Sequence, residues 1–201
     1  MMSKTHLAVG VAAALVSCRP NDLSGVLAAV LGGAAGGALC DVECHSFSPN
    51  KDTVQGRVLA CGIAVAALAA DYFTQRGLWN SILSQPVHSL FLGAAILSLS
   101  CLIGHFSPHR TFTHSAFFLL LIFAGFARLS PLLSGAALMG GLSHVALDLL
   151  NHKPVCFLYP ILKNGVCLHL CAADKAANRF FLWAGSLASA ALIAQRLIAM
   201  R

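Results

Sequence analysis

Seven apolar stretches, separated by short polar segments, set the pattern of this chain. Several of them are shorter than the about 20 residues that a perpendicular membrane span needs. Some are therefore expected to be partial spans or to be buried inside a bundle. We predict one helix in each stretch, over residues 7–18, 23–40, 57–73, 88–104, 114–129, 131–149 and 180–197.

Polar and small residues between and within these stretches predict how the helices are joined. Pro20 and Asp22 can end the first helix and begin the second, and Pro131 follows a tight reversal between the fifth and sixth. Thr113 is a candidate N-cap that would hold His114 in the first turn of the fifth helix. The glycines and alanines of 31–38 indicate a centrally packed second helix. The mixed segment 150–179 is expected to be interfacial or re-entrant.

Composition places the chain in a membrane. Of its 201 residues, 58% are hydrophobic and 10% charged, and the mean hydropathy is +0.78. Soluble domains carry about 25% charged residues. We therefore predict an all-α fold, a polytopic membrane bundle of about six or seven helices in one domain, residues 1–201. The net charge of +6 is scattered through loops with no basic run, so it does not indicate a nucleic-acid partner.

The N-terminal segment and the cysteines do not indicate a secreted protein. Lys4 precedes an apolar run, but no small-residue cleavage site follows it, so we expect a retained first helix rather than a signal peptide. The eight cysteines have no small-domain disulfide pattern and are interpreted as reduced thiols that mostly pack.

If the first six helices each cross the bilayer, their ends alternate between two faces. Histidines and carboxylates then gather on one face, while the other receives only Asp22, Asp71 and His88. Helix-packing histidines would have no reason to segregate in this way. The gathered residues are His6, Asp41, Glu43, His45, His105, His109, Arg110, His114, His144, Asp148 and His152.

Basic residues are also more frequent on the face that carries the histidines. By the positive-inside rule, this predicts that the face with the histidines, and with it the candidate site, faces the cytoplasm. On that face lie Lys4, Lys51, Arg57, Arg110, Lys153, Lys163, Lys175 and Arg179, against Arg19, Arg76, Arg128, Arg196 and Arg201 on the other.

Three clusters supply candidate metal ligands. His144 and Asp148 lie four residues apart, hence on one face of an apolar helix. They suit a divalent metal, or alternatively a hydrogen bond that ties two helices together. Asp41 and Glu43 could chelate one ion or bridge two, unless they belong to a solvated loop. The third cluster contains His109, Arg110 and His114, which could bind a metal and an anion or form a polar surface loop.

These blocks resemble the YdjM-like family of membrane-bound metal-dependent hydrolases. The resemblance rests on Thr5-His6, on 37–45, on His109-Arg-Thr-Phe-Thr-His-Ser115 and on 141–151 with Leu158-Tyr-Pro160, in the family's order. It implies a polytopic inner-membrane protein with a metal-dependent hydrolase activity. The family's motif residues correspond to His6, Asp41, Glu43, His109, Arg110, His114, His144 and Asp148.

The chain departs from the family in its acidic block. The family tends to have Pro-Asp-x-Asp-His, whereas this chain has Cys40-Asp-Val-Glu-Cys-His45, and Thr111 stands where a glycine is usual. Either Cys44 or His45 could therefore take the ligand position.

The hypothesis is a centre of one or two divalent ions, Zn or Mn, held at the membrane face by these histidines and carboxylates. Metal-activated water would attack an ester or phospho-ester of a lipid-like substrate, with Arg110 and Glu43 as catalytic residues. A metal-stabilised scaffold remains possible, as does an ion transporter, although a transporter should place ionisable groups near the midplane. A cysteine-based site from Cys40, Cys44 and His45 with Cys167, His169 and Cys171 is a weaker alternative.

Overall fold

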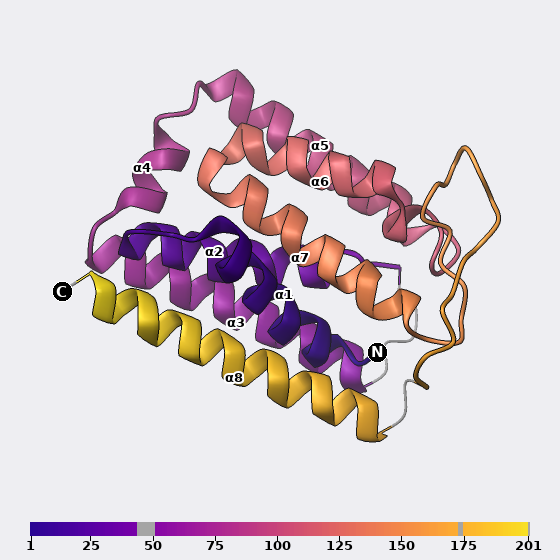
Figure 1. Cartoon of the computed structure of the whole chain (residues 1–201). Coiled ribbons are helices and arrows are strands. Elements are labelled where there is room, and N and C mark those ends of the chain that lie inside the picture. Colours follow the sequence, from indigo (N-terminus) through magenta and orange to yellow (C-terminus); the bar gives the residue numbers. More distant parts are fainter. Residues whose placement is uncertain (44–50, 173–174, 201) are drawn as a thin grey trace.

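The protein is a bundle of helices that run side by side, as the computed structural model shows for residues 1–43, 51–172 and 175–200 (Figure 1). No strand occurs in these ranges. The helices are α1 (Ser3–Cys18), α2 (Leu23–Leu39), α3 (Lys51–Phe73), α4 (Gly77–Leu83), α5 (Val87–His105), α6 (Ala116–Leu129), α7 (Pro131–Leu149) and α8 (Lys175–Ala199), with a 3₁₀ turn, η1 (Phe112–His114).

All seven predicted helices are present, and α4 is an additional short helix. Four of the seven begin earlier than predicted, α5 by one residue and α1, α3 and α8 by four to six, because hydropathy marks only their apolar part. In α3 the first turns are polar and include Asp52, whose carboxylate accepts a hydrogen bond from the Ser3 N–H at 2.9 Å. This bond satisfies a free donor at the start of α1.

The helix ends follow local chemistry. Asp22 is the N-cap of α2 and accepts a hydrogen bond from the Gly25 N–H at 2.9 Å. The prediction for Thr113 is wrong, because Ser115 is the N-cap of α6 and accepts from the Phe118 N–H at 3.2 Å. His114 therefore lies in η1 instead of the first turn of α6, and the Thr113 hydroxyl turns inward.

The second helix packs at the centre, as its small residues predicted. It contacts α1, α3 and α7. At Gly36 an added Cβ would lie 2.0 Å from the Ala137 carbonyl oxygen of α7, and at Gly33 it would lie 2.6 Å from the Gly10 carbonyl oxygen of α1. Backbones this close exclude any side chain. As a result, close backbone contacts fix the positions of α1, α2 and α7 relative to one another.

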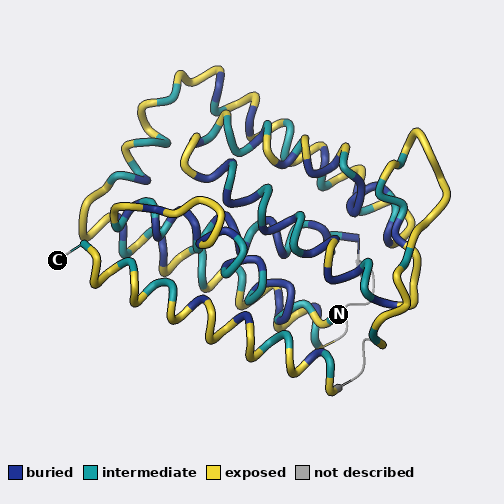
Figure 2. The backbone as a smooth tube through the Cα atoms, in the orientation of Figure 1, coloured by how far each residue is buried: buried dark blue, intermediate teal, exposed yellow. Residues whose placement is uncertain are grey.

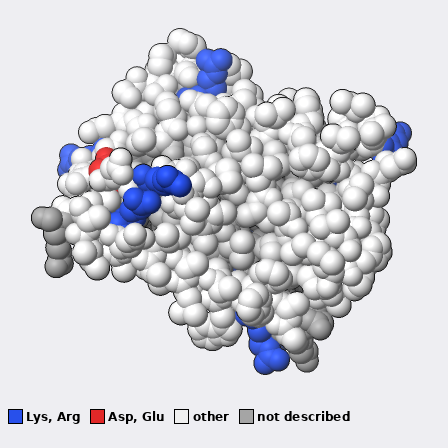
Figure 3. Space-filling view, in the orientation of Figure 1, with Lys and Arg blue, Asp and Glu red and all other residues white. Residues whose placement is uncertain are grey.

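Exposure separates a central layer from outer helices (Figure 2). The inner faces of α1, α2 and α7 are buried, whereas α3, α5 and α8 expose most of their apolar side chains. Figure 3 shows a face that few charged side chains interrupt. Four helices are long and apolar enough to span a membrane: Lys51–Phe73, Val87–His105, Pro131–Leu149 and Ala176–Ala199. Three apolar helices are shorter: Ser3–Cys18, Leu23–Leu39 and Ala116–Leu129.

The predicted parity of helix ends is confirmed. The start of α1, the ends of α2, α5 and α7 and the start of α8 all lie at one end of the bundle, which we call the site end, while α4 and the end of α8 lie at the other (Figure 1).

Residues 150–172 form an extended segment across the site end, which we call the cover segment. It contains one isolated antiparallel bridge, between Val155 and Val166. It lies beyond the helix ends rather than between helices (Figure 1). The interfacial alternative therefore fits better than the re-entrant one.

Candidate metal centre

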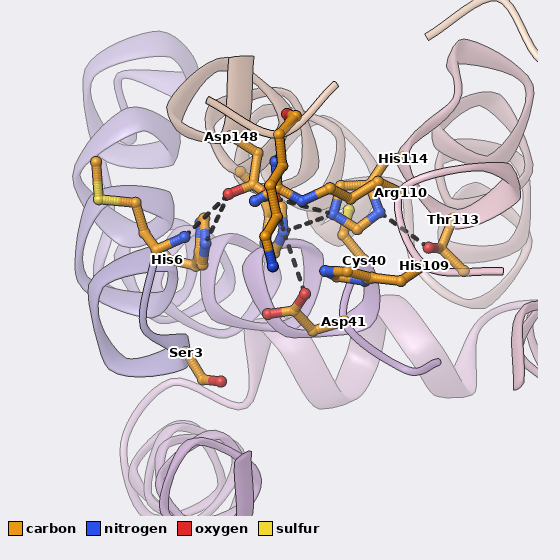
Figure 4. Close-up of polar contacts among 12 residues, drawn as sticks. Ser3, His6, Cys40, Asp41, His109, Arg110, Thr113, His114 and Asp148 are labelled. Atoms are coloured by element: carbon orange, nitrogen blue, oxygen red, sulfur yellow. Dashed lines mark hydrogen bonds and ion pairs between the residues drawn. The ribbon is translucent and has the colours of Figure 1, made fainter. Parts of the chain in front are cut away.

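Side chains from five segments meet at the site end (Figure 4). His6 comes from α1, Asp41 and Glu43 follow α2, His109 and Arg110 precede η1, His114 ends η1, and His144 and Asp148 come from the last turns of α7. His6, His114 and His144 are at most 1% exposed. Three imidazoles have thus been withdrawn from water, which requires compensating partners.

Three overlapping groups of donors could each hold a metal ion. Within each group the ligand atoms lie within 4.8 Å of one another. The groups share His114 and His144, so they form one continuous cluster. They are His6, His144 and Asp148; then Asp41, His114 and His144; and finally Glu43, His109 and His114.

The first group surrounds the carboxylate of Asp148. His6 Nε2 lies 3.6 Å from Asp148 Oδ1 and the Met1 nitrogen lies 3.0 Å from the same oxygen. The rings of His6 and His144 stack with centroids 3.6 Å apart. His144 Nδ1 lies 2.8 Å from the Gly37 carbonyl oxygen, to which its N–H donates. Because Nδ1 carries the proton in this bond, Nε2 of a neutral His144 is the unprotonated nitrogen, and it faces the cluster. This arrangement is common in metal-binding histidines.

The second group lies at the middle of the cluster. His144 Nε2 lies 3.5 Å from Asp41 Oδ1 and 3.2 Å from His114 Nε2. His114 Nε2 also lies 3.3 Å from Asp148 Oδ2. Two imidazole nitrogens that face one another between two carboxylates need either a proton or a cation between them.

The third group is organised by Glu43, which is buried. Its Oε1 lies 3.0 Å from His109 Nδ1 and 3.2 Å from His114 Nδ1, and it accepts the Arg110 N–H at 2.9 Å. Its Oε2 accepts a hydrogen bond from the Thr113 hydroxyl. This carboxylate therefore fixes both histidines as well as the backbone that connects them.

Electrostatics around the third group favour charged forms. Burial raises the pKa of Glu43, but hydrogen bonds from His109 and His114 outweigh it and leave that pKa below its usual value. Burial lowers the pKa of His114, yet its hydrogen bonds to Asp148 and Glu43 raise it to about 9. The ionised form of Glu43 is thus favoured, and so is the protonated, positively charged form of His114.

The residues fit a divalent metal by their chemistry. All the donors are imidazole nitrogens or carboxylate oxygens, which suit zinc and manganese. In addition, His6 Nδ1 and Arg110 Nε are buried without a hydrogen-bond partner. Unsatisfied buried donors of this kind are rare and commonly mark a functional site.

Arg110 is engaged with the cluster and with the cover segment. It has a left-handed backbone, with φ of 65°. Its Nη2 lies 3.0 Å from Asp148 Oδ2, and Nη1 donates to the Lys153 carbonyl oxygen at 2.6 Å. Its own carbonyl oxygen accepts the Cys156 N–H at 2.9 Å. Arg110 therefore balances the charge of a ligand candidate, Asp148, and anchors the cover segment.

Not every sequence-predicted residue enters the cluster. His45 and Cys44 lie outside the described residues, so the choice between them stays a prediction. His105 and His152 are at the site end but belong to none of the three groups. In the described part of the chain no group contains a cysteine. Buried Cys40 places its thiol 3.6 Å from the Gly36 carbonyl oxygen, which is a packing role.

Two participants were missed by sequence reasoning. The Thr113 hydroxyl bonds Glu43 and lies 3.0 Å from His114 Nδ1, and the Gly37 carbonyl orients His144. Thr113 was noticed only as a cap. A backbone carbonyl carries no sequence signal at all.

A polytopic helical membrane protein with a buried cluster of histidines and carboxylates at one end is the class that this fold and site define. The model of the YdjM inner membrane protein family matches residues 1–200, and the chain belongs to that family. The resemblance found in the motifs is thereby confirmed. Neither the curated proteins nor the solved structures contain a significant match to this chain.

Proposed function

We propose that the protein is a membrane-embedded metal-dependent hydrolase that cleaves an ester or phospho-ester of an amphiphilic substrate. The observation that carries this proposal is the sharing of His114 and His144 among three donor groups within 4.8 Å. Shared ligands suit one or two ions held close together. A bound divalent ion would lower the pKa of a coordinated water and polarise the scissile group.

The protein's own residues would position that chemistry. Glu43 would hold His109 and His114 at fixed angles through its bonds to both rings. Asp41 is the most exposed carboxylate of the cluster, with 16% of its side chain accessible, and is therefore the ligand nearest an incoming substrate. Arg110 would balance the charge of Asp148, while its unbonded Nε remains available to an anionic group.

Two other functions need to be separated from a hydrolase, a transporter by the position of the cluster and a scaffold by an assay. A transporter should place its ionisable groups near the bilayer midplane with access from both faces. Here the clustered residues lie near the starts and ends of their helices, and these helix ends gather at one end of the bundle (Figure 1). A metal-stabilised scaffold would use the same ligands without turnover, and only an assay separates it from an enzyme.

The first experiment is elemental analysis of the purified protein. We expect zinc or manganese in the wild type, and loss of metal in His144→Ala and in Asp41→Ala. His88→Ala is the matched control, because His88 is an exposed imidazole at the start of α5, at the opposite end of the bundle. Equal metal content in all four proteins would reject the metal centre.

The second experiment asks for turnover. The wild type is incubated with chromogenic phospho-esters and with lipid extracts, with and without a chelator. Product that forms only with metal, and not in His144→Ala, supports the hydrolase. A protein that retains its metal and cleaves nothing in either assay would be the scaffold.

A further inference from the structure

A small hollow lies beside Asp41, between α1 and α3. Its walls include Ser3 and Leu7 of α1 and Thr53 and Arg57 of α3. Ser3 and Asp41 lie on the same side of the cluster (Figure 4). The hollow has a volume of about 20 Å³, which is room for about one water molecule, and it reaches Asp41, the most accessible carboxylate of the cluster.

An apolar groove adjoins this hollow. It runs between α1, α3 and α8 and has a volume of about 240 Å³. Leu7 belongs to both, so one side chain separates them. Leu59, Ile63 and Leu182 line the groove, whose accessible surface is almost entirely apolar. Its volume suits part of one extended chain and not a partner helix, which is about 10 Å across.

Two cations stand where the hollow and the groove meet the site end. Lys4 lines the groove and donates to Gln55 Oε1 at 3.1 Å, and Arg57 lines the hollow. An ammonium and a guanidinium beside an apolar groove complement a molecule with an anionic head and an apolar tail. Their place at helix ends corresponds to the level of lipid head groups.

Another apolar hollow lies under the cover segment but lacks this complement. It is lined by Leu149, Phe157, Leu158, Leu162, Asn164 and Val166, and no basic residue is among them. The cover segment is moreover tied down on that side, since the Ala116 N–H donates to the Phe157 carbonyl oxygen at 2.8 Å. The groove between α1, α3 and α8 is therefore the one that combines basic residues, an apolar lining and a neighbouring hollow that reaches a metal-ligand candidate.

We propose that the substrate is a single-chain lipid with a phosphate head group, which binds from the leaflet in the groove between α1, α3 and α8. Arg57 and Lys4 bind the phosphate at the outer side of the hollow that reaches Asp41, and the acyl chain lies in the groove against Leu59 and Ile63. This inference rests on the proposed function, because it assigns a substrate class to the same centre.

Binding of a long-chain lysophosphatidic acid to the detergent-purified full chain tests the proposal. Ile63→Trp and Leu59→Trp fill the groove, and Arg57→Gln removes one charge. We expect each to weaken binding by about tenfold, the scale of one charge-assisted hydrogen bond or a few displaced methylenes. The control is Val65→Trp, on the same helix at a position 69% exposed, and it should bind like the wild type.

Two further probes identify which part of the lipid is recognised. A zwitterionic lysophosphatidylcholine should bind the wild type more weakly than lysophosphatidic acid does. This preference for lysophosphatidic acid should be smaller in Arg57→Gln, in which Lys4 is the remaining cation. Inorganic phosphate alone should bind no more weakly to Ile63→Trp than to the wild type.

Unchanged lysophosphatidic acid affinity in the three variants overturns the proposal, and so does an equal loss in Val65→Trp. Binding is measured on both metal-loaded and chelated protein, and metal content is recorded for each sample. If the protein holds metal but its lipid affinity does not depend on the groove residues, only the lipid-site inference is rejected. If the protein holds no metal but binds the lipid as expected, the hydrolase proposal is rejected and the lipid site stands.

Discussion

At the scale of single residues, the cluster is held by partners that are not themselves metal-ligand candidates. Thr113 donates to Glu43, and the Gly37 carbonyl fixes the ring of His144. Partners of this kind set ligand orientation, and their loss typically reduces metal affinity 10–100-fold. The geometry of the candidate ligands therefore depends on residues that look ordinary in the sequence.

Thr113→Val tests this dependence. The change keeps the shape of the side chain but removes the hydroxyl, so Glu43 Oε2 loses a buried donor, at a cost of about 1–3 kcal/mol. We expect a roughly tenfold loss of metal affinity, measured by competition with a chromogenic chelator.

Thr111→Val is the matched control for that experiment. The Thr111 hydroxyl donates to the Pro108 carbonyl oxygen of its own loop and not to the cluster. If both variants bind metal equally well, Thr113 has no positioning role.

At the scale of elements, glycines determine how near the helices approach. The contact of Gly36 with Ala137 leaves no room for a methyl group. Because Asp41 follows α2 and His144 lies on α7, the distance between these two helices also sets the distance between two candidate ligands.

Gly36→Ala should separate α2 from α7. Overpacking of this kind costs about 1–3 kcal/mol, so we expect a lower melting temperature in detergent and less bound metal. Gly62→Ala is the control, since nothing lies within 4 Å of a Cβ added there. It should leave metal content unchanged and leave the melting temperature equal or higher, since alanine favours a helix over glycine. Equal effects of the two substitutions would contradict the packing argument.

Seven of the helices could be predicted from the sequence, but the short helix α4 could not. Hydropathy located seven helices, and small residues placed α2 at the centre. The short helix α4 was missed because its start depends on a buried carboxylate at the end of α3 that is held by a distant residue. Asp71 Oδ2 accepts the Trp79 N–H at 3.0 Å, and Asp71 Oδ1 accepts the hydroxyl of Ser24 in α2 at 2.6 Å. Such tertiary contacts leave no periodic pattern.

At the scale of the whole molecule, the parity of the crossings was the most informative property of the sequence. It predicted that His6, Asp41, His114 and His144 meet although they lie far apart along the chain, and they do. It could not predict which donors share an ion, because that depends on distances of an ångström set by ring orientation.

Orientation in the membrane is a prediction of the same scale. The excess of basic residues at the site end predicts that this end faces the cytoplasm. Since α8 runs from the site end to the opposite end (Figure 1), a reporter fused after it should lie outside the cytoplasm. A reporter that fluoresces only in the cytoplasm should stay dark there and should light up when fused ahead of α1. The reverse pair of signals would invert the assigned orientation.

The overlap at His114 and His144 has a consequence for how the protein can change over time. Each of these imidazoles belongs to two of the three donor groups, so a substitution at either one leaves a single group intact. Without His114 the group of His6, His144 and Asp148 remains, and without His144 the group of Glu43, His109 and His114 remains. Descendants of this chain that lose one of these histidines should therefore keep one complete set of candidate ligands, whereas loss of both removes all three sets.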